Sequence, residues 1–171
     1  SHYQYICTNI MKVRKTIIYE RIIQREPLKY DFLTEWAIVR RWAQVNYGIR
    51  LSDLEMLFFL HGNRLFRKSD FDEYKNFMTW DRDRFNRLLK EGWITEWRQK
   101  NYNEGQLYEV SFKTKKMITS IYKKLIGEEP IPTSSRRNKA FRKNAPFNQK
   151  TLAIAITDFN RRRKQRPSPE L

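Results

Sequence analysis

The chain has 171 residues, which suits one domain with an extension and supports a hydrophobic core without disulfides. Its formal net charge of +16 indicates a polyanionic partner, because like charges this numerous repel one another unless they are compensated. One cysteine and two histidines leave little material for a disulfide, a zinc site or a Ser-His-Asp arrangement, so we expect no enzyme, cofactor or metal. No apolar run approaches the ~18 residues of a membrane span, and no secretory signal is visible. We therefore expect a soluble cytoplasmic protein, nucleoid-associated or, if viral, in the host cytoplasm.

The first stretch, residues 1–30, is an N-terminal extension rich in Ile, Tyr and Thr, which favour strands. The isoleucine pairs at 17–18 and 22–23 also fit helical spacing, so strand and helix both stay open. Pro27 is expected to mark its end, because the residue before a proline disfavours helix.

Residues 31–127 are predicted to form one domain, which opens with an amphipathic helix. Apolar residues recur there at three- and four-residue spacing, and Gly48 supplies the stop. These apolar positions are Phe32, Trp36, Val39 and Ala43.

Two shorter helices are expected next. Ser52 and Glu55 have the spacing of a capping box, which predicts the start of a helix. That helix should run through Leu60 and stop at Gly62. A third helix, capped by its first serine, is expected over residues 69–77.

A short basic helix over residues 80–91 is predicted from Thr79 as its cap and Gly92 as its left-handed stop. Advancing ~100° per residue places its apolar side chains on one face and its charged ones on the other. The apolar face consists of Phe85, Leu88 and Leu89.

After that glycine the period changes to alternation. Residues 93–98 and 107–112 alternate as strands do, and the polar run between them predicts a hairpin with a protruding tip. Thr114 is expected to cap a last helix of the domain, which ends at Gly127. Its apolar stripe is Met117, Ile118, Ile121, Tyr122 and Leu125.

The C-terminal tail, residues 128–171, is expected to be an extended basic linker with one amphipathic helix over residues 148–163. It holds 11 Lys+Arg and 4 Asp+Glu, a net charge of 11 − 4 = +7. The fold class expected for the whole chain is mainly α with a small β hairpin.

The order of these elements resembles a winged helix-turn-helix domain, closest to the MarR-type regulators. The segments that carry it are L-S-D-L-E-M-L-F-F-L, F-N-R-L-L-K-E-G-W-I-T-E-W and L-Y-E-V-S-F-K-T-K-K-M-I-T-S-I-Y-K-K-L, within residues 32–126. They are similar to that family's second helix, to its recognition helix running into the wing, and to its return strand and following helix. The tip Q-K-N-Y-N-E-G-Q departs from the family, whose wing usually carries arginines.

The resemblance implies a recognition helix at residues 80–91 that enters a DNA major groove. Arg can bond guanine and Asn can bond adenine there, so Arg87 and Asn86 are the candidates for reading bases. The flanking cations Arg82, Arg84 and Lys90 are expected on phosphates. The alternative is a solvated helix, in which Asp83 and Arg87 form an ordinary i,i+4 ion pair.

Further phosphate contacts are expected from the wing, from the start of the following helix and from the tail. These candidates are Arg98, Lys100, Lys113, Lys115, Arg161, Arg162 and Arg163. The three lysines at 113, 115 and 116 are equally well explained as a solvated cluster.

The function predicted on these grounds is sequence-specific or semi-specific binding of double-stranded DNA, as a transcription regulator. The alternative is an assembly protein, associated with RNA polymerase or a virion, whose tail docks a protein partner. Its anchors would be Leu152, Ile156 and Phe159. No membrane is expected, and a homodimer stays open.

Overall fold

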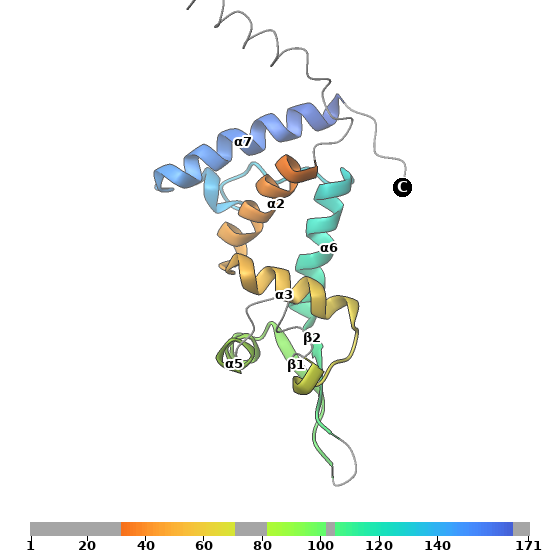
Figure 1. Ribbon diagram of the computed structural model, residues 1–171. Helices are drawn as coiled ribbons and strands as arrows, with labels where there is room; N and C mark the ends of the chain where they lie inside the picture. The colour runs from red at the N-terminus through yellow and green to blue at the C-terminus, as the bar shows by residue number, and fades with distance from the viewer. Residues whose placement is uncertain (1–31, 71–81, 102–104, 166–171) are drawn as a thin grey trace, which may run out of the picture. The chain divides into compact units, whose positions relative to one another are not determined.

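The computed structural model describes residues 32–70, 82–101 and 105–165. All of these except Phe32 belong to one compact unit, Leu33–Leu171. The unit is mainly helical with a small two-stranded antiparallel sheet, which confirms the predicted class at this level (Figure 1). Its elements are α2 (Phe32–Tyr47), α3 (Leu51–Gly62), η1 (Lys68–Asp70), α5 (Arg82–Lys90), β1 (Ile94–Arg98), β2 (Leu107–Val110), α6 (Phe112–Ile126), η2 (Lys139–Phe141) and α7 (Phe147–Lys164).

The helices end at the predicted glycines, and three of these glycines are left-handed. Gly48, Gly92 and Gly127 have φ angles of 68°, 77° and 87°, a left-handed backbone that a Cβ would strain. Helix α3 also ends at Gly62 as predicted, but Gly62 is its last helical residue and is not left-handed. The left-handed residue after α3 is Arg64, with a φ of 50°.

Two predicted caps are corrected. Helix α3 begins at Leu51 after Arg50, which makes no side-chain capping bond, so Ser52 lies inside the helix. Helix α6 is capped by Ser111, whose hydroxyl accepts from the amide of Thr114 at 3.3 Å. Thr114 instead donates its own hydroxyl to the Trp93 carbonyl at 2.7 Å, which ties α6 to the start of β1.

The predicted hairpin is confirmed. Strands β1 and β2 pair antiparallel from Ile94 opposite Val110 to Arg98 opposite Leu107. An isolated bridge adds Phe66 beside Tyr108, with both backbone bonds made, at 3.1 and 2.9 Å. The chain segment before η1 is thereby fixed to the hairpin at β2.

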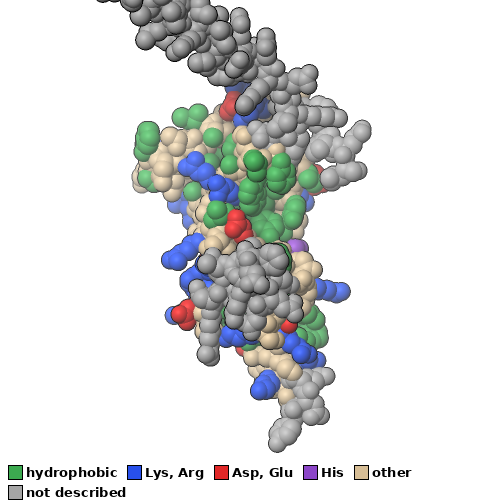
Figure 2. Space-filling view, in the orientation of Figure 1, with side chains coloured by type: hydrophobic (Ala, Val, Ile, Leu, Met, Phe, Trp, Pro, Cys, Tyr) green, Lys and Arg blue, Asp and Glu red, His purple; other side chains and the backbone are tan. Residues whose placement is uncertain are grey.

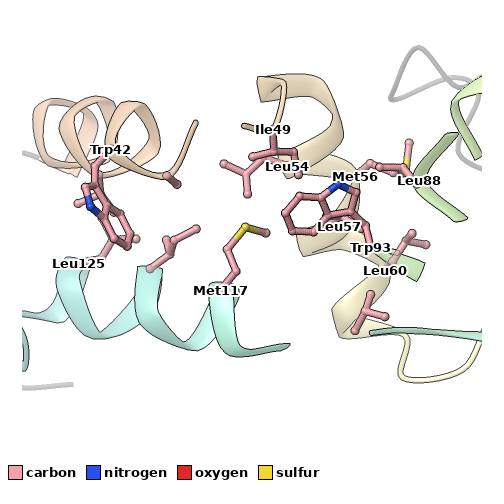
Figure 3. Close-up of a cluster of buried hydrophobic side chains, with 14 of the residues drawn as sticks. Trp42, Ile49, Leu54, Met56, Leu57, Leu60, Leu88, Trp93, Met117 and Leu125 are labelled. Atoms are coloured by element: carbon pink, nitrogen blue, oxygen red, sulfur yellow. The ribbon is translucent and has the colours of Figure 1, made fainter. Parts of the chain in front are cut away.

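A single hydrophobic core joins these elements (Figure 3). Trp42 from α2 and Leu125 from α6 pack at one end, and Leu57, Leu88 and Trp93 pack at the other. Removing this much apolar surface from water is the main stabilising term of the fold. Helix α5 is therefore positioned by burial of its apolar face, with the polar face left outside.

The segment that precedes α7 is not the extended linker that the sequence predicted. Ile131 and Ala140 are buried in the core, and η2 packs against α7. Helix α7 itself confirms the prediction over 148–163, with one residue more at each end. The segment before α7 packs on the core because Ile131 and Ala140 anchor it there, next to the apolar face of α7.

Several predictions lie outside the described residues: those on the 1–30 extension, on Thr79, on the tip at 102–104 and on the chain end after 165. Of the third helix, only the turn η1 falls within them. No helix among the described residues is both long and apolar enough to cross a membrane.

Candidate nucleic-acid interface

Helix α5 presents a polar face beside the hairpin, as the apolar pattern predicted. Phe85 and Leu88 are fully buried, whereas Asp83, Asn86 and Lys90 are exposed. Phe85 packs edge-on against Tyr108 of β2, with ring centroids 4.9 Å apart. The helix and the hairpin therefore form one surface.

Two of the predicted DNA-binding arginines are bound inside the molecule. Nη2 of Arg87 lies 2.9 Å from both carboxylate oxygens of Asp53, and Nε of Arg84 lies 3.4 Å from one of them. Asp53 belongs to α3 and is only 2% exposed. Since a buried carboxylate without partners is strongly disfavoured, these arginines lock α5 onto α3. Arg87 thus pairs with Asp53 of α3, and not with Asp83, the partner expected of a solvated helix.

The exposed Asn86 of α5 contacts Lys68, a cation that was not predicted as a site residue. Nζ of Lys68, in η1, donates to Oδ1 of Asn86 at 3.1 Å and lies 5.0 Å from the centroid of the Phe85 ring. Lys90 is exposed one turn further along α5. The side chain of Arg82 lies outside the described residues.

The tip end of the hairpin carries further basic side chains. Arg67 lies beside the wing, with its Nε 3.9 Å from the position a Cβ would take on Gly105. Lys100 is exposed, and the guanidinium of Arg98 lies 6.0 Å from the centroid of the Trp97 ring. The bridge at Phe66 explains why η1 lies between α5 and the wing.

The lysines at the start of α6 are held in place by neighbours. Nζ of Lys113 lies 3.6 Å from the centroid of the Trp93 ring and donates to the carbonyl of Glu91 at 3.3 Å. Lys115 pairs with Glu109 at 2.6 Å. Lys113 is thus fixed near the junction of α5 and β1, and Lys115 is largely neutralised.

The three arginines predicted at the end of the tail all have partners within the chain. Arg161 pairs with Asp158, and so does Arg162, at 3.0 Å. Arg163 pairs with Glu35 of α2 and donates to the carbonyl of Leu125 in α6. This end of α7 therefore lies against the start of α2, at the other end of that helix from α3.

The predicted docking anchors are corrected as well. Leu152, Ile156 and Phe159 are 1%, 0% and 3% exposed, because α7 folds its apolar face onto the core of its own chain. The exposed large apolar side chains of α7 are Phe147 and Ile154 instead. The tail forms part of the fold and does not display a hydrophobic arm through these three residues.

The aromatic side chain at the centre of the interface is Tyr108. Its ring stacks on Phe66 at 6.3 Å and meets Phe85 edge-on. Burial raises the pKa of the Tyr108 phenol above its usual value, and the charge of Glu96 acts in the same direction. The phenol is therefore neutral around pH 7 and adds no negative charge to the basic surface.

Arg67 and Lys68 lie on this surface but were not predicted from the sequence. They belong to the basic run R-L-F-R-K that leads into η1, and this run was the available signal. Asp53 was not predicted either, because a partner 34 residues away from Arg87 leaves no local pattern.

No known family model matches the chain, and no curated protein or solved structure is significantly similar to it. The residues that the structure describes contain no group of three or more His, Cys, Asp or Glu that could hold a metal ion.

Proposed function

We propose that the chain is a winged-helix protein that binds double-stranded DNA, with α5 as its recognition helix and β1 and β2 as its wing. The order of elements supports this: α3, a β bridge at Phe66, α5, the hairpin and α6 follow one another along the chain. A helix that buries one face and leaves the other beside a hairpin can enter a major groove.

One observation carries the proposal. Lys68 joins η1 to α5 through Asn86, and Arg67 lies against the wing, so the turn, helix and wing present their polar side chains together. Lys90 extends this row on α5. Such cations neutralise phosphates, and each contact adds about 0.9 to the slope of log affinity against log salt.

The binding we propose is semi-specific, dominated by phosphate contacts. Asn86 is the exposed candidate for reading a base, and the partner of its Oδ1 is the exposed Lys68, whereas Arg87 has committed Nη2 to the buried Asp53. Phosphate contacts set position and affinity but carry no sequence information directly. Transcription regulation as the use of this binding rests on the resemblance to MarR-type regulators alone.

A salt titration of binding to duplex DNA, single-stranded DNA and RNA tests the proposal. We expect tightest binding to the duplex. In the double variant Lys68→Gln and Lys90→Gln, the salt slope should fall by about 1.8, because two phosphate contacts are lost. The matched control is Arg161→Gln with Arg162→Gln, which removes the same charge at the far end of α7 and should leave the slope unchanged.

Two results would contradict the proposal: wild-type affinity for duplex no greater than for single strands, or a double variant that binds like the wild type at every salt concentration. The variant Asn86→Ala distinguishes a sequence-specific base contact from phosphate contacts that only position the protein. It should weaken preferred sequences more than random duplex, since only a base contact is sensitive to sequence.

The assembly alternative loses its predicted anchors, because Leu152, Ile156 and Phe159 are inside the core. Buried in this way, these three residues cannot contact a partner protein. We therefore propose the DNA-binding function alone.

A further inference from the structure

A second group of cations lies in the segment before α7, which we call the basic loop, residues 134–143. Its sequence is S-S-R-R-N-K-A-F-R-K, and residues 130–157 contain no Asp or Glu at all. All five of its cationic residues are exposed: Arg136, Arg137, Lys139, Arg142 and Lys143. Throughout the described ranges, no acidic side chain forms an ion pair with any of them.

The basic loop is held in a defined conformation by one buried residue, Asn138. Its side chain is 0% exposed, accepts from the amide of Ala140 and from the side-chain amide of Asn46 at 3.1 Å each, and donates to the carbonyl of Pro132 at 2.8 Å. Lys139 donates its backbone amide to Asn46 at 2.9 Å. The backbone that carries the cations is therefore ordered before any ligand binds, which lowers the entropy cost of binding.

The anchor places the basic loop on the α5 side of the molecule. Asn46 lies in the last turn of α2, and the chain then passes Gly48 and Arg50 into α3. In the first turn of α3, Asp53 binds Arg84 and Arg87 of α5. The basic loop, the corner between α2 and α3, and α5 thus follow one another along one edge, as Figure 1 shows at its left.

Basic side chains recur along this edge. Lys and Arg gather on the left of Figure 2 from the level of η2 down to that of α5. Arg50 is exposed at the corner, between the basic loop and α5. By contrast, Arg163 pairs with Glu35 in the first turn of α2, so the arginines at the end of α7 lie away from this edge.

We propose that the basic loop is a second phosphate-binding element of the same surface. It would contact the backbone of one DNA duplex beyond the stretch that α5 and the wing cover, with Arg50 between them. This inference rests on the proposed function and adds a site of its own. Unpaired cations on an ordered backbone are suited to such contacts, because they release counterions without giving up ion pairs in the protein.

The test compares two variants of the full chain with equal loss of charge. Arg136→Gln with Arg137→Gln alters the basic loop, and Arg161→Gln with Arg162→Gln is the matched control, also an adjacent pair of exposed arginines. Each is titrated with salt on two fluorescent random-sequence duplexes, one of about one helical turn and one of about three turns. Circular dichroism checks that both variants fold like the wild type.

On the long duplex, the basic-loop variant should have a salt slope lower by about 1.8 and a footprint shortened at one end. On the short duplex it should match the wild type, because α5 and the wing fill that site. The control should match the wild type on both.

An unchanged slope for the basic-loop variant on the long duplex would overturn this inference and leave the proposed function standing. An equal loss on both duplexes would also overturn it, since the basic loop would then share the site of α5. Wild-type chain that binds neither duplex would overturn both the inference and the proposed function.

Discussion

Helix α5 and the basic loop are similar in sequence, but their arginines differ in their partners within the chain. Both carry arginines in a short polar run, yet Arg84 and Arg87 of α5 bind the buried Asp53, whereas Arg136 and Arg137 of the basic loop are exposed and form no ion pair in the described part of the chain. The difference lies in what faces each element. An acidic residue in the adjoining helix converts a cation into a structural pair, and only a surface without such a residue leaves the cation for a ligand.

The largest effect is expected from removing the acid beneath α5. Asp53→Ala leaves Arg84 and Arg87 without their partner in a half-buried setting, and should lower the free energy of unfolding by about 3–5 kcal/mol. Urea denaturation measures this. Asp158→Ala, which removes the acid from an exposed arginine pair, is the control and should cost no more than about 1 kcal/mol. Equal losses would mean that α5 is not locked by Asp53.

A smaller effect is expected from loosening the basic loop without changing its charge. Asn138→Ala removes the buried side chain and its hydrogen bonds, and should cost about 1–3 kcal/mol in urea denaturation. It should also weaken binding to the long duplex, since the cations lose their ordered backbone. Asn144→Ala, at an exposed asparagine just after the basic loop, should change neither quantity. Unaltered stability in Asn138→Ala would show that the loop is not anchored there.

Lys124 is a buried cation whose acidic partner, Glu129, is partly exposed. It is 3% exposed, with its Nζ 4.5 Å from the centroid of the Trp42 ring and 3.5 Å from Glu129. Burial lowers the pKa of Lys124, and the hydrogen bond from Lys123 lowers the pKa of Glu129 below its usual 4.5. The ionised form of Glu129 therefore stabilises the fold above about pH 4.5, and this contribution is lost as the pH falls through the lowered pKa.

Glu129→Gln should consequently reduce stability by no more than about 1 kcal/mol at neutral pH. The gap between variant and wild type should narrow as the pH falls below about 4.5. Thermal unfolding followed over a pH series measures both. A gap that stays constant into the acid range would show that the charge of Glu129 contributes nothing to the pair.

The smallest effect is expected from the basic loop itself. Arg136→Gln with Arg137→Gln should change the free energy of unfolding by less than about 0.5 kcal/mol, because neither side chain has an ion pair to lose. Arg87→Gln, by comparison, should cost clearly more in the same urea titration. If the two variants cost the same, the contrast between α5 and the basic loop fails.

Much of the fold could be predicted from local signals. The alternation after Gly92 predicted β1 and β2, and three- to four-residue apolar spacing predicted α7 to within one residue at each end. The end of α6 was predicted as well, but its cap is Ser111 and not Thr114. Left-handed glycines fix helix ends through their own backbone, so Gly48 and Gly127 could be identified without knowing the tertiary structure.

The site could be predicted only in part, because whether a cationic side chain is free to bind a ligand depends on residues that are distant in the sequence. Ser52 and Glu55 suggested a capping box, yet the important residue between them is Asp53, whose partners lie on α5. The segment before α7 looked like a linker because of its Pro and Ser, whereas Asn138 and Asn46 join it to α2 across 92 residues. Pairs of this kind leave no periodicity to detect.

Tyr108 has a mechanical consequence. Its backbone is bonded to Phe66 in both directions, and its ring touches Phe85, so one residue connects the turn, the hairpin and α5. Because protein interiors are close-packed, a displacement of any one of the three is transmitted to the other two through these contacts. The turn, the hairpin and α5 should therefore move as one rigid body, and bending of the hairpin should change the orientation of α5.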